Sequence, residues 1–290
     1  MKFNKNLIAA TAFLAIAGVA HAAGPDPVET NTLNRGESIA SNGYTFSDLS
    51  GSGTLSFSKS LITALNLAFV AMQAVPEATL NISTSKNASG AVKYVSVSAA
   101  APVTGLTSTF DGATVNVLSV QTNGGSLQTV GKNTATNGPG SLSISDLKVD
   151  LTTKTIYADI VGANGVGTLN DYALWKYDSI SGPTTFSLDP HAPASSGAKT
   201  LSSTNTLTGL FLVNAADVDN IFVKALNLNN TGRSGINTVN TRSSTNTDGF
   251  GSITSNITVI ATPIPEPSTY ALMGVGLVGL ALFGRRRAAR

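Results

Sequence analysis

The chain has no cysteine, and among its 290 residues there are only two histidines and one tryptophan. Without cysteine it cannot form a disulfide framework, bind zinc or an iron–sulfur cluster through thiolates, or use a thiol nucleophile. Only 12% of the residues are charged, whereas 42% are hydrophobic, which excludes an extended polyelectrolyte. A chain of this length can bury a substantial core.

Basic residues are scarce between the two ends of the chain. Six of the 18 basic residues lie at the extreme termini, which leaves 12 basic against 16 acidic side chains, a net charge of −4, between residues 23 and 284. The sequence pI of about 8.8 therefore describes the ends rather than the body. The body lacks the positive field that attracts nucleic acid, and we expect no nucleic-acid partner.

The first 22 residues have the order of a secretory signal peptide. Lys2 and Lys5 precede an apolar run over residues 7–20, and the small residues Ala20 and Ala22 precede Ala23. This pattern predicts export through the Sec pathway and cleavage by signal peptidase between Ala22 and Ala23. The mature protein would then begin at Ala23.

The last 28 residues combine a proline-rich spacer, an apolar stretch and a basic end. Alternating prolines over residues 263–267 favour an extended, exposed chain with few amide donors. Residues 270–283 carry no charge, but 14 helical residues span about 21 Å, short of a hydrocarbon core of about 30 Å. The pattern predicts a short or transient transmembrane helix. The positive-inside rule keeps the following arginines cytoplasmic, namely Arg285, Arg286, Arg287 and Arg290.

Two other interpretations of this tail compete with a sorting signal. Residues 274–279 match the G-x-G-x-x-G pattern of dinucleotide-binding turns, but no strand precedes them and no second strand can follow, so the glycines fit helix contacts better. A single conventional membrane anchor remains the alternative to a processed tail.

Pro265, Glu266 and Pro267, the apolar stretch and the arginine cluster together resemble the PEP-CTERM sorting signal of Gram-negative bacteria. The same tail is also labelled an ice-binding protein C-terminal domain, a name that implies no ice binding here. The resemblance covers residues 263–290. It implies that an exosortase, a membrane protease-transferase, recognises Pro265, Glu266 and Pro267. It further implies a passenger at the cell surface or in the extracellular matrix of a bacterium that makes exopolysaccharide.

The body, residues 23–262, is dense in Ser, Thr, Asn and Gly and alternates apolar and polar residues over short runs. Such alternation occurs over residues 54–58, 94–98, 114–117, 142–144, 155–161 and 253–259, and turn signals such as Asn42-Gly43 separate the runs. We expect a mainly β protein, an antiparallel β-sandwich-like or two-layer body.

One or two short helices are expected within this body. Residues 59–66 have helical spacing after the possible cap Ser58, and residues 69–75 then become strand-like. Residues 214–226 predict a second helix, with Asn214 as its cap and an apolar stripe that covers a sheet. The polar stretch over residues 227–249 is predicted to be a long mobile loop.

The body offers few groups for catalysis. His191 is the only histidine left after processing, and no nucleophile elbow accompanies it. A glycosidase needs two carboxylates at a defined separation, but the candidate acids fit a solvated surface better: Asp146, Asp150, Asp159, Asp171 and Asp178.

Two more groups could bind a ligand. Residues 217–220 could offer oxygens to calcium but lack the EF-hand glycine and glutamate, so acids at a helix start explain them better. Tyr172, Trp175 and Tyr177 could stack on sugars, but core packing is the simpler interpretation.

The sequence therefore predicts a non-enzymatic, exported surface or matrix protein without metal or cofactor. Its predicted segments are the signal peptide (residues 1–22), the β-rich passenger (23–262) and the sorting tail (263–290). Signal peptidase, the exosortase-like enzyme and exopolysaccharide are its expected partners, with transient membrane association. The alternative is a secreted glycan-acting hydrolase or a sugar-binding module with a plain C-terminal anchor.

Overall fold

The computed structural model describes residues 27–192, 194–265 and 274–278. Its strands are β1 (Glu29–Asn34), β2 (Ile39–Ser41), β3 (Tyr44–Phe57), β4 (Ala71–Val75), β5 (Thr79–Lys86), β6 (Val92–Phe110), β7 (Thr114–Thr122), β8 (Gly125–Val130), β9 (Gly140–Asp150), β10 (Thr155–Gly162), β11 (Gly167–Lys176), β12 (Ser179–Ser181), β13 (Thr185–Ser187), β14 (Lys199–Thr208), β15 (Phe211–Leu212) and β16 (Gly251–Pro263). The helices are α1 (Lys59–Leu67), η1 (Ala194–Ser196), η2 (Val218–Val223) and α2 (Asn230–Asn240).

All sixteen strands belong to one open sheet, and every pairing between them is antiparallel. The central order is β12-β14-β16-β3-β6-β7-β9-β10-β11-β15. The mainly antiparallel β prediction is confirmed. The strands do not divide into two separate sheets, because the long strand β6 joins the two parts of the body: its first half pairs with β3 and β5, and its second half pairs with β1 and β7.

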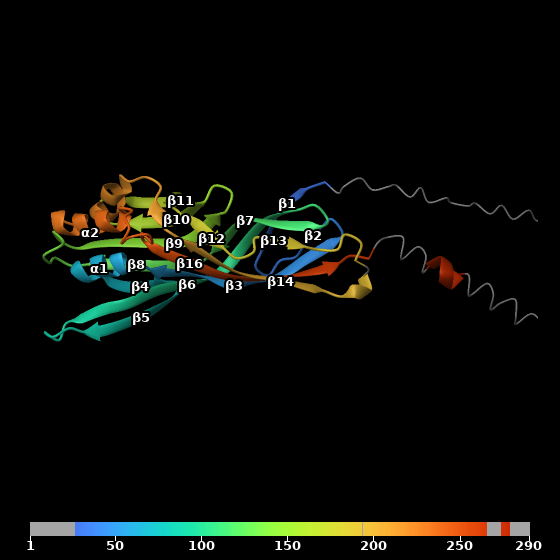
Figure 1. Ribbon diagram of the computed structural model, residues 1–290, viewed down its shortest axis with the longest axis horizontal. Coiled ribbons are helices and arrows are strands. Elements are labelled where there is room, and N and C mark those ends of the chain that lie inside the picture. Colours follow the sequence, from blue (N-terminus) through green and yellow to red (C-terminus); the bar gives the residue numbers. More distant parts are fainter. Residues whose placement is uncertain (1–26, 193, 266–273, 279–290) are drawn as a thin grey trace, which may run out of the picture.

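Side chains from both parts of this sheet face a shared interior. Alternation on β10 buries Ile156, Ala158 and Ile160 completely, as its sequence predicts. Two hydrophobic clusters fill the interior, one beside the helices and the other at the end where β1 begins and β16 ends. Figure 1 shows the helices α1 and α2 at one end of a long body and the two exits of the described chain at the other.

The helix α1 forms as predicted. Ser58 is its N-cap, and the Ser58 hydroxyl accepts the Leu61 N–H at 3.1 Å and donates to the Gly249 carbonyl. Leu61, Ile62 and Leu65 form the buried stripe. The strand-like segment that follows is β4.

The second predicted helix is only partly an α-helix. The buried stripe of Val218, Ile221 and Phe222 is present, but η2 is a π-helix. The Asn214 side chain accepts the Ala216 N–H, within the turn that precedes the helix. Asp217 makes no capping bond, because its side chain turns into the interior instead.

The prediction of a mobile loop over residues 227–249 is wrong. This stretch contains α2, whose N-cap Asn229 accepts the N–H groups of Thr231 and Gly232. Only Ile236 and Val239 supply large apolar side chains to the core from this helix. The helix also packs closely on α1 and η2, a tertiary contact that the sparse apolar pattern did not reveal.

Candidate functional site

The two exits of the described chain lie together, beside the turn between β2 and β3. This turn is the predicted Asn42-Gly43 pair, and both residues have positive φ (39° and 79°), as a two-residue hairpin loop requires. The Asn42 amide donates to the Pro27 carbonyl at 2.9 Å and to the Phe110 carbonyl at 3.0 Å. The Gly43 carbonyl accepts the Ile264 N–H at 2.8 Å. One turn therefore holds both the entry and the exit of the body.

The last strand leads almost directly into the predicted sorting motif. Pro263, assigned to the spacer by its sequence, is instead buried as the last residue of β16 and pairs with Tyr44. The β14 pairing stops at Ala261, so no strand on that side needs the amide hydrogen that proline lacks. Pro265 follows after one exposed residue, Ile264. The motif thus begins at the surface of the body.

Most residues of the predicted terminal signals lie outside the described part of the chain. These are Glu266, Pro267, the arginines Arg285, Arg286, Arg287 and Arg290, and the cleavage site at Ala20, Ala22 and Ala23. The predicted transmembrane helix over residues 270–283 is described only at 274–278, which are helical, with Val275 and Leu277 exposed. Within the described ranges we find no helix with the length and apolar character needed to cross a membrane.

Comparison with known proteins identifies this tail. Residues 263–287 match the family model of the PEP-CTERM protein-sorting motif. The chain carries a PEP-CTERM sorting motif. No curated protein and no solved structure matches the chain. The PEP-CTERM motif implies export, processing by an exosortase-like membrane enzyme and surface localisation after C-terminal membrane anchoring. The match is confined to the tail and assigns no activity to the body.

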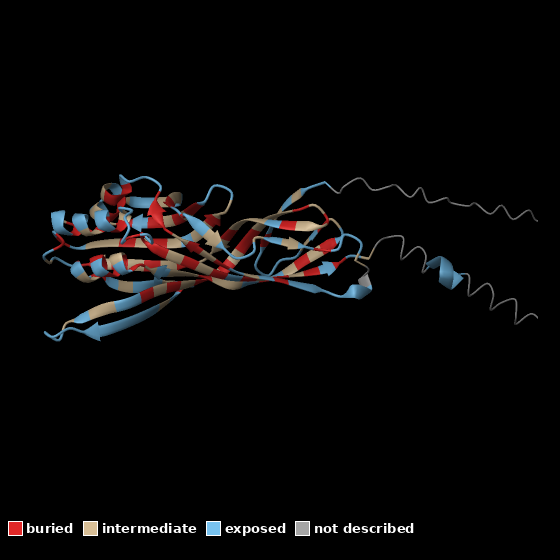
Figure 2. Ribbon diagram, viewed as in Figure 1, coloured by how far each residue is buried: buried red, intermediate tan, exposed pale blue. Residues whose placement is uncertain are grey.

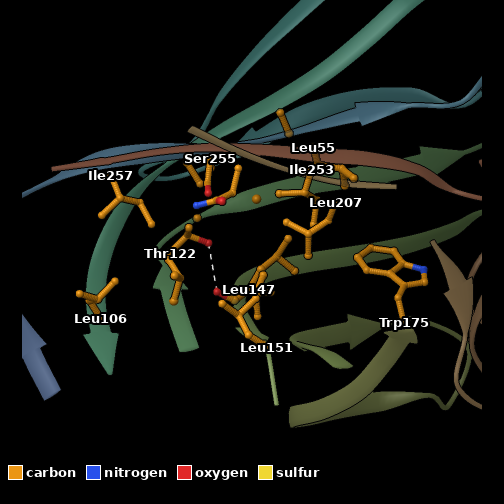
Figure 3. Close-up of a pocket in the computed structure, with 18 of the residues that line it drawn as sticks. Leu55, Leu106, Thr122, Leu147, Leu151, Trp175, Leu207, Ile253, Ser255 and Ile257 are labelled. Carbon is orange, nitrogen blue, oxygen red and sulfur yellow. Dashed lines mark hydrogen bonds between the residues drawn. The ribbon is translucent and has the colours of Figure 1, made fainter. Parts of the chain in front are cut away.

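An apolar cavity of about 130 Å³ lies in the interior of that body, between the two parts of the sheet. Leu147 and Leu151 border it from one part, and Leu207 and Ile253 border it from the other (Figure 3). A group of polar side chains interrupts its apolar lining, namely Thr122, Ser126, Gln128, Ser203, Asn205 and Ser255. Ligand pockets are usually about 300–1,000 Å³, so this cavity is too small for a sugar or a larger substrate.

Five of these six polar side chains have hydrogen-bond partners. Gln128 donates to the Ser126 hydroxyl at 2.7 Å, and the Asn205 amide lies 3.0 Å from the Ser203 hydroxyl. The Thr122 hydroxyl donates to the Leu147 carbonyl at 3.2 Å (Figure 3). Because these groups already have partners, we interpret them as a stable polar layer between the two hydrophobic clusters rather than as a reactive site.

Trp175 belongs to the core, in agreement with the simpler interpretation of the aromatic cluster. Its side chain is only 2% exposed and packs against Phe250, with ring centroids 5.8 Å apart. An irregularity in the pairing of β10 with β11 lets Leu174 and Trp175 both face the interior. The indole N–H has no partner in the described structure and points away from the labelled leucines of the cavity (Figure 3). Trp175 is therefore not placed to stack on a sugar at the surface.

The candidate acids are spread over turns and ion pairs. Asp146 accepts the Gly124 N–H at 2.7 Å, and Asp159 accepts the Asp171 N–H at 2.7 Å. Asp171 pairs with Lys148 at 2.8 Å, and Asp178 pairs with Arg242. None of these acids is among the residues that line the interior cavity.

Asp150 closes the turn between β9 and β10. Burial raises the pKa of its carboxyl group, but hydrogen bonds from Thr152 and Thr153 outweigh this effect and lower the pKa overall. A carboxylate held in its charged form by turn donors is suited to fixing a turn rather than to acting as a general acid.

Among the acids of the described residues, only Asp217 has a raised pKa, because burial disfavours its charged form more than the Tyr172 hydroxyl stabilises it. It is 2% exposed, and its two oxygens accept the Tyr172 hydroxyl at 3.0 and 3.1 Å. Its neighbour Asp219 pairs with Arg233 instead. Over the residues that the structure describes, no group of three or more metal-ligating side chains occurs, and the candidate calcium ligands point to different partners.

His191 lies in an exposed turn, where its backbone N–H donates to the Asp189 carboxylate at 2.9 Å. The role of Asn42 in holding both exits was not predicted from the sequence. The Asn42-Gly43 signal predicts the turn, but no local pattern indicates that the same side chain reaches residues 27 and 110.

Proposed function

We propose that this protein is exported, sorted by an exosortase through its PEP-CTERM motif, and displayed as a non-enzymatic protein at the cell surface or in the extracellular matrix. The observation that carries the proposal is the PEP-CTERM match over residues 263–287, which begins where β16 ends. A signal peptide over residues 1–22 completes the route, since export must precede C-terminal sorting.

The geometry of the two exits supports display of the body away from its attachment point. Pro27 and Ile264 are both held by the turn at Asn42 and Gly43. The helices α1 and α2 lie at the opposite end of the body (Figure 1). A chain attached at residue 265 would therefore present that end outward, toward the matrix and its exopolysaccharide.

The structural partners of the candidate acids support the non-enzymatic part of the proposal. Each has a structural partner, and the interior cavity holds no charged lining residue among those described. The Asp146→Asn and Asp178→Asn variants should therefore leave matrix polysaccharide turnover unchanged. A purified wild-type chain that cleaves this polysaccharide, with loss of cleavage in either variant, would overturn this part.

The sorting part is tested by intact mass of the protein recovered from the cell surface, in cells with and without the exosortase. We expect loss of residues 1–22 in both strains and loss of the tail only with the enzyme. Glu266→Ala should retain the tail and remain in the membrane fraction, whereas Glu37→Ala, an exposed acid in the body, should be processed normally. A wild-type product that keeps Arg290 in both strains would indicate a plain anchor instead.

A further inference from the structure

The interior cavity follows the inner face of β14, where every second residue lines it. Buried residues run along the length of the body, from the helices to the end where the chain exits (Figure 2). On β14, Leu201 and Leu207 are the outermost lining residues, and Ser203 and Asn205 lie between them. At the rise of an antiparallel strand, this lining is about 20 Å long. The cavity is therefore elongated, with apolar ends and a polar middle.

Ser255 is a buried polar residue in the middle of this cavity. It lies on β16 opposite Asn205, is 8% exposed and points from its strand toward Thr122 (Figure 3). Among the described residues, its hydroxyl has no hydrogen-bond partner, whereas the other polar lining residues each have one. A buried hydroxyl without a partner costs free energy, which a ligand that bonds to it would recover.

The neighbour of Ser255 on the other side of the sheet is a glycine. Gly53 of β3 pairs with Ser255 and also lines the cavity. A Cβ added at Gly53 would meet only the Thr122 methyl carbon within 4 Å, at a distance of 3.2 Å. The missing side chain therefore leaves space beside the Ser255 hydroxyl.

The volume and the lining of the cavity define the class of ligand that it can take. An apolar cavity of about 150 Å³ holds a molecule as large as benzene, and this cavity measures about 130 Å³. No charged side chain is found among the described residues that line it. A charged ligand would therefore lose its hydration without gaining an ionic partner. The single unpartnered hydroxyl can match one polar group of a neutral ligand.

We propose that this cavity is a binding site for a small neutral molecule with an apolar body and one hydroxyl group, such as phenol or a short-chain alcohol. The ligand hydroxyl shares a hydrogen bond with Ser255. The apolar part of the ligand packs between Ile253 and Leu147, which border the cavity from opposite sides (Figure 3). The proposal rests on the body alone and holds independently of how the tail is sorted.

The first test uses Trp175, the only tryptophan, which also lines the cavity and is 2% exposed. The probe is bromobenzene, whose heavy atom quenches tryptophan emission on contact. We expect saturable quenching in the full chain, purified in a mild detergent. Bromide ions at the same concentration should leave the emission unchanged, because they do not enter an apolar interior. Phenol and benzene should each reverse the quenching by competition.

The second test compares phenol with benzene in the Ser255→Ala variant. The affinity for phenol should fall about two- to tenfold, as for the loss of one hydrogen bond, whereas the affinity for benzene should change by less than about twofold. Ser202→Ala removes an exposed hydroxyl of β14 and should change neither affinity. Partition into detergent is the same for all variants, so it cancels when their phenol-to-benzene ratios are compared. Unchanged Trp175 emission without ligand checks that each variant is folded.

Three results would overturn the proposal. Bromobenzene that fails to quench Trp175 in a saturable manner would show that small apolar molecules do not enter the cavity. Quenching that neither phenol nor benzene reverses would place the bound probe elsewhere. A phenol-to-benzene ratio that is the same in wild type and Ser255→Ala would show that the serine hydroxyl does not bind the ligand.

Discussion

At the residue scale, Asp217 and Asp150 show how the fold gives two carboxyl groups opposite properties. Asp217 is buried, and one hydroxyl donor, that of Tyr172, faces both of its oxygens. Asp150 lies in a turn and accepts three hydrogen bonds from Thr152 and Thr153. The pKa of the first is raised and that of the second is lowered. The two residues should therefore affect stability with opposite pH dependence.

We predict that Asp217→Asn stabilises the protein increasingly, relative to wild type, as pH rises. Because the pKa of Asp217 is raised in the folded state, its contribution is full below the ordinary carboxyl pKa and is lost as pH rises through the raised value. The amide carries no such dependence. Urea unfolding at several pH values between about 4 and 8 measures the difference.

Asp150→Asn is the control, and the pH dependence of its stability should have the opposite sign. The pKa of Asp150 is lowered, so its contribution is present above the ordinary carboxyl pKa and is lost as pH falls through the folded value. The variant should be destabilised near neutral pH and approach wild type in acid. Equal pH profiles for the two variants would contradict both assignments.

Ser58 is a second residue with a definite energetic role. Its hydroxyl caps α1 and also donates to the Gly249 carbonyl, within a buried contact. Ser58→Ala should lower the free energy of unfolding by about 1–2 kcal/mol, because a helix N–H and a buried carbonyl both lose a partner. Thr63→Ala, on the exposed face of the same helix, should cost less in the same urea titration.

At the scale of elements, α2 depends on contacts that a helix-propensity argument omits. A Cβ added at Gly232 would lie 2.5 Å from the Ala135 carbonyl oxygen and 3.0 Å from Leu228 Cβ. A Cβ added at Gly235 would meet Ala64 Cβ at 3.6 Å, an ordinary contact. Close packing therefore requires glycine at position 232, whereas the space at position 235 would accept a methyl group.

Alanine at these two positions should change stability in opposite directions. Gly232→Ala should destabilise the protein by about 1–3 kcal/mol, because the new methyl group forces α2 away from residue 135. Gly235→Ala should stabilise it by up to about 1 kcal/mol, since alanine is the better helix former and the space is free. Thermal unfolding of the two variants checks the sign, and the same sign for both would contradict the packing described here.

At the scale of the whole molecule, we expect the position of the motif next to the body to limit the access of the sorting enzyme. Ile264 is still hydrogen-bonded to Gly43, and Pro265 is half-buried. An enzyme that recognises residues 265–267 must therefore work close to the β2–β3 turn. This closeness follows from the tertiary structure, since the sequence alone places an extended spacer from residue 263 onward.

A flexible spacer should relieve this restriction. We expect insertion of six Gly and Ser residues after Ile264 to speed tail removal several-fold, as measured by pulse-chase labelling in cells with the exosortase. The same insertion in the exposed loop after Asn87 should leave processing unchanged. A processing rate unaffected by the spacer would indicate that the body does not limit access.

The sequence by itself determined the sorting tail, the β-rich body, the hairpin turn at Asn42-Gly43 and the helix after Ser58. These features depend on local order along the chain: a motif, a period of two, a turn pair and a cap. It also indicated correctly that Trp175 lies in the core, since core packing is the simpler interpretation of a lone aromatic cluster.

Tertiary structure decided the joining of the strands into one sheet through β6, the formation of α2 and the burial of Asp217. It also decided that the Asn66 side chain binds the backbone of Tyr94 at the edge of β6. These outcomes depend on which distant segments meet. The energies of such long-range contacts leave no periodic pattern in the sequence. For that reason the local patterns predicted the elements, and only packing fixed their neighbours.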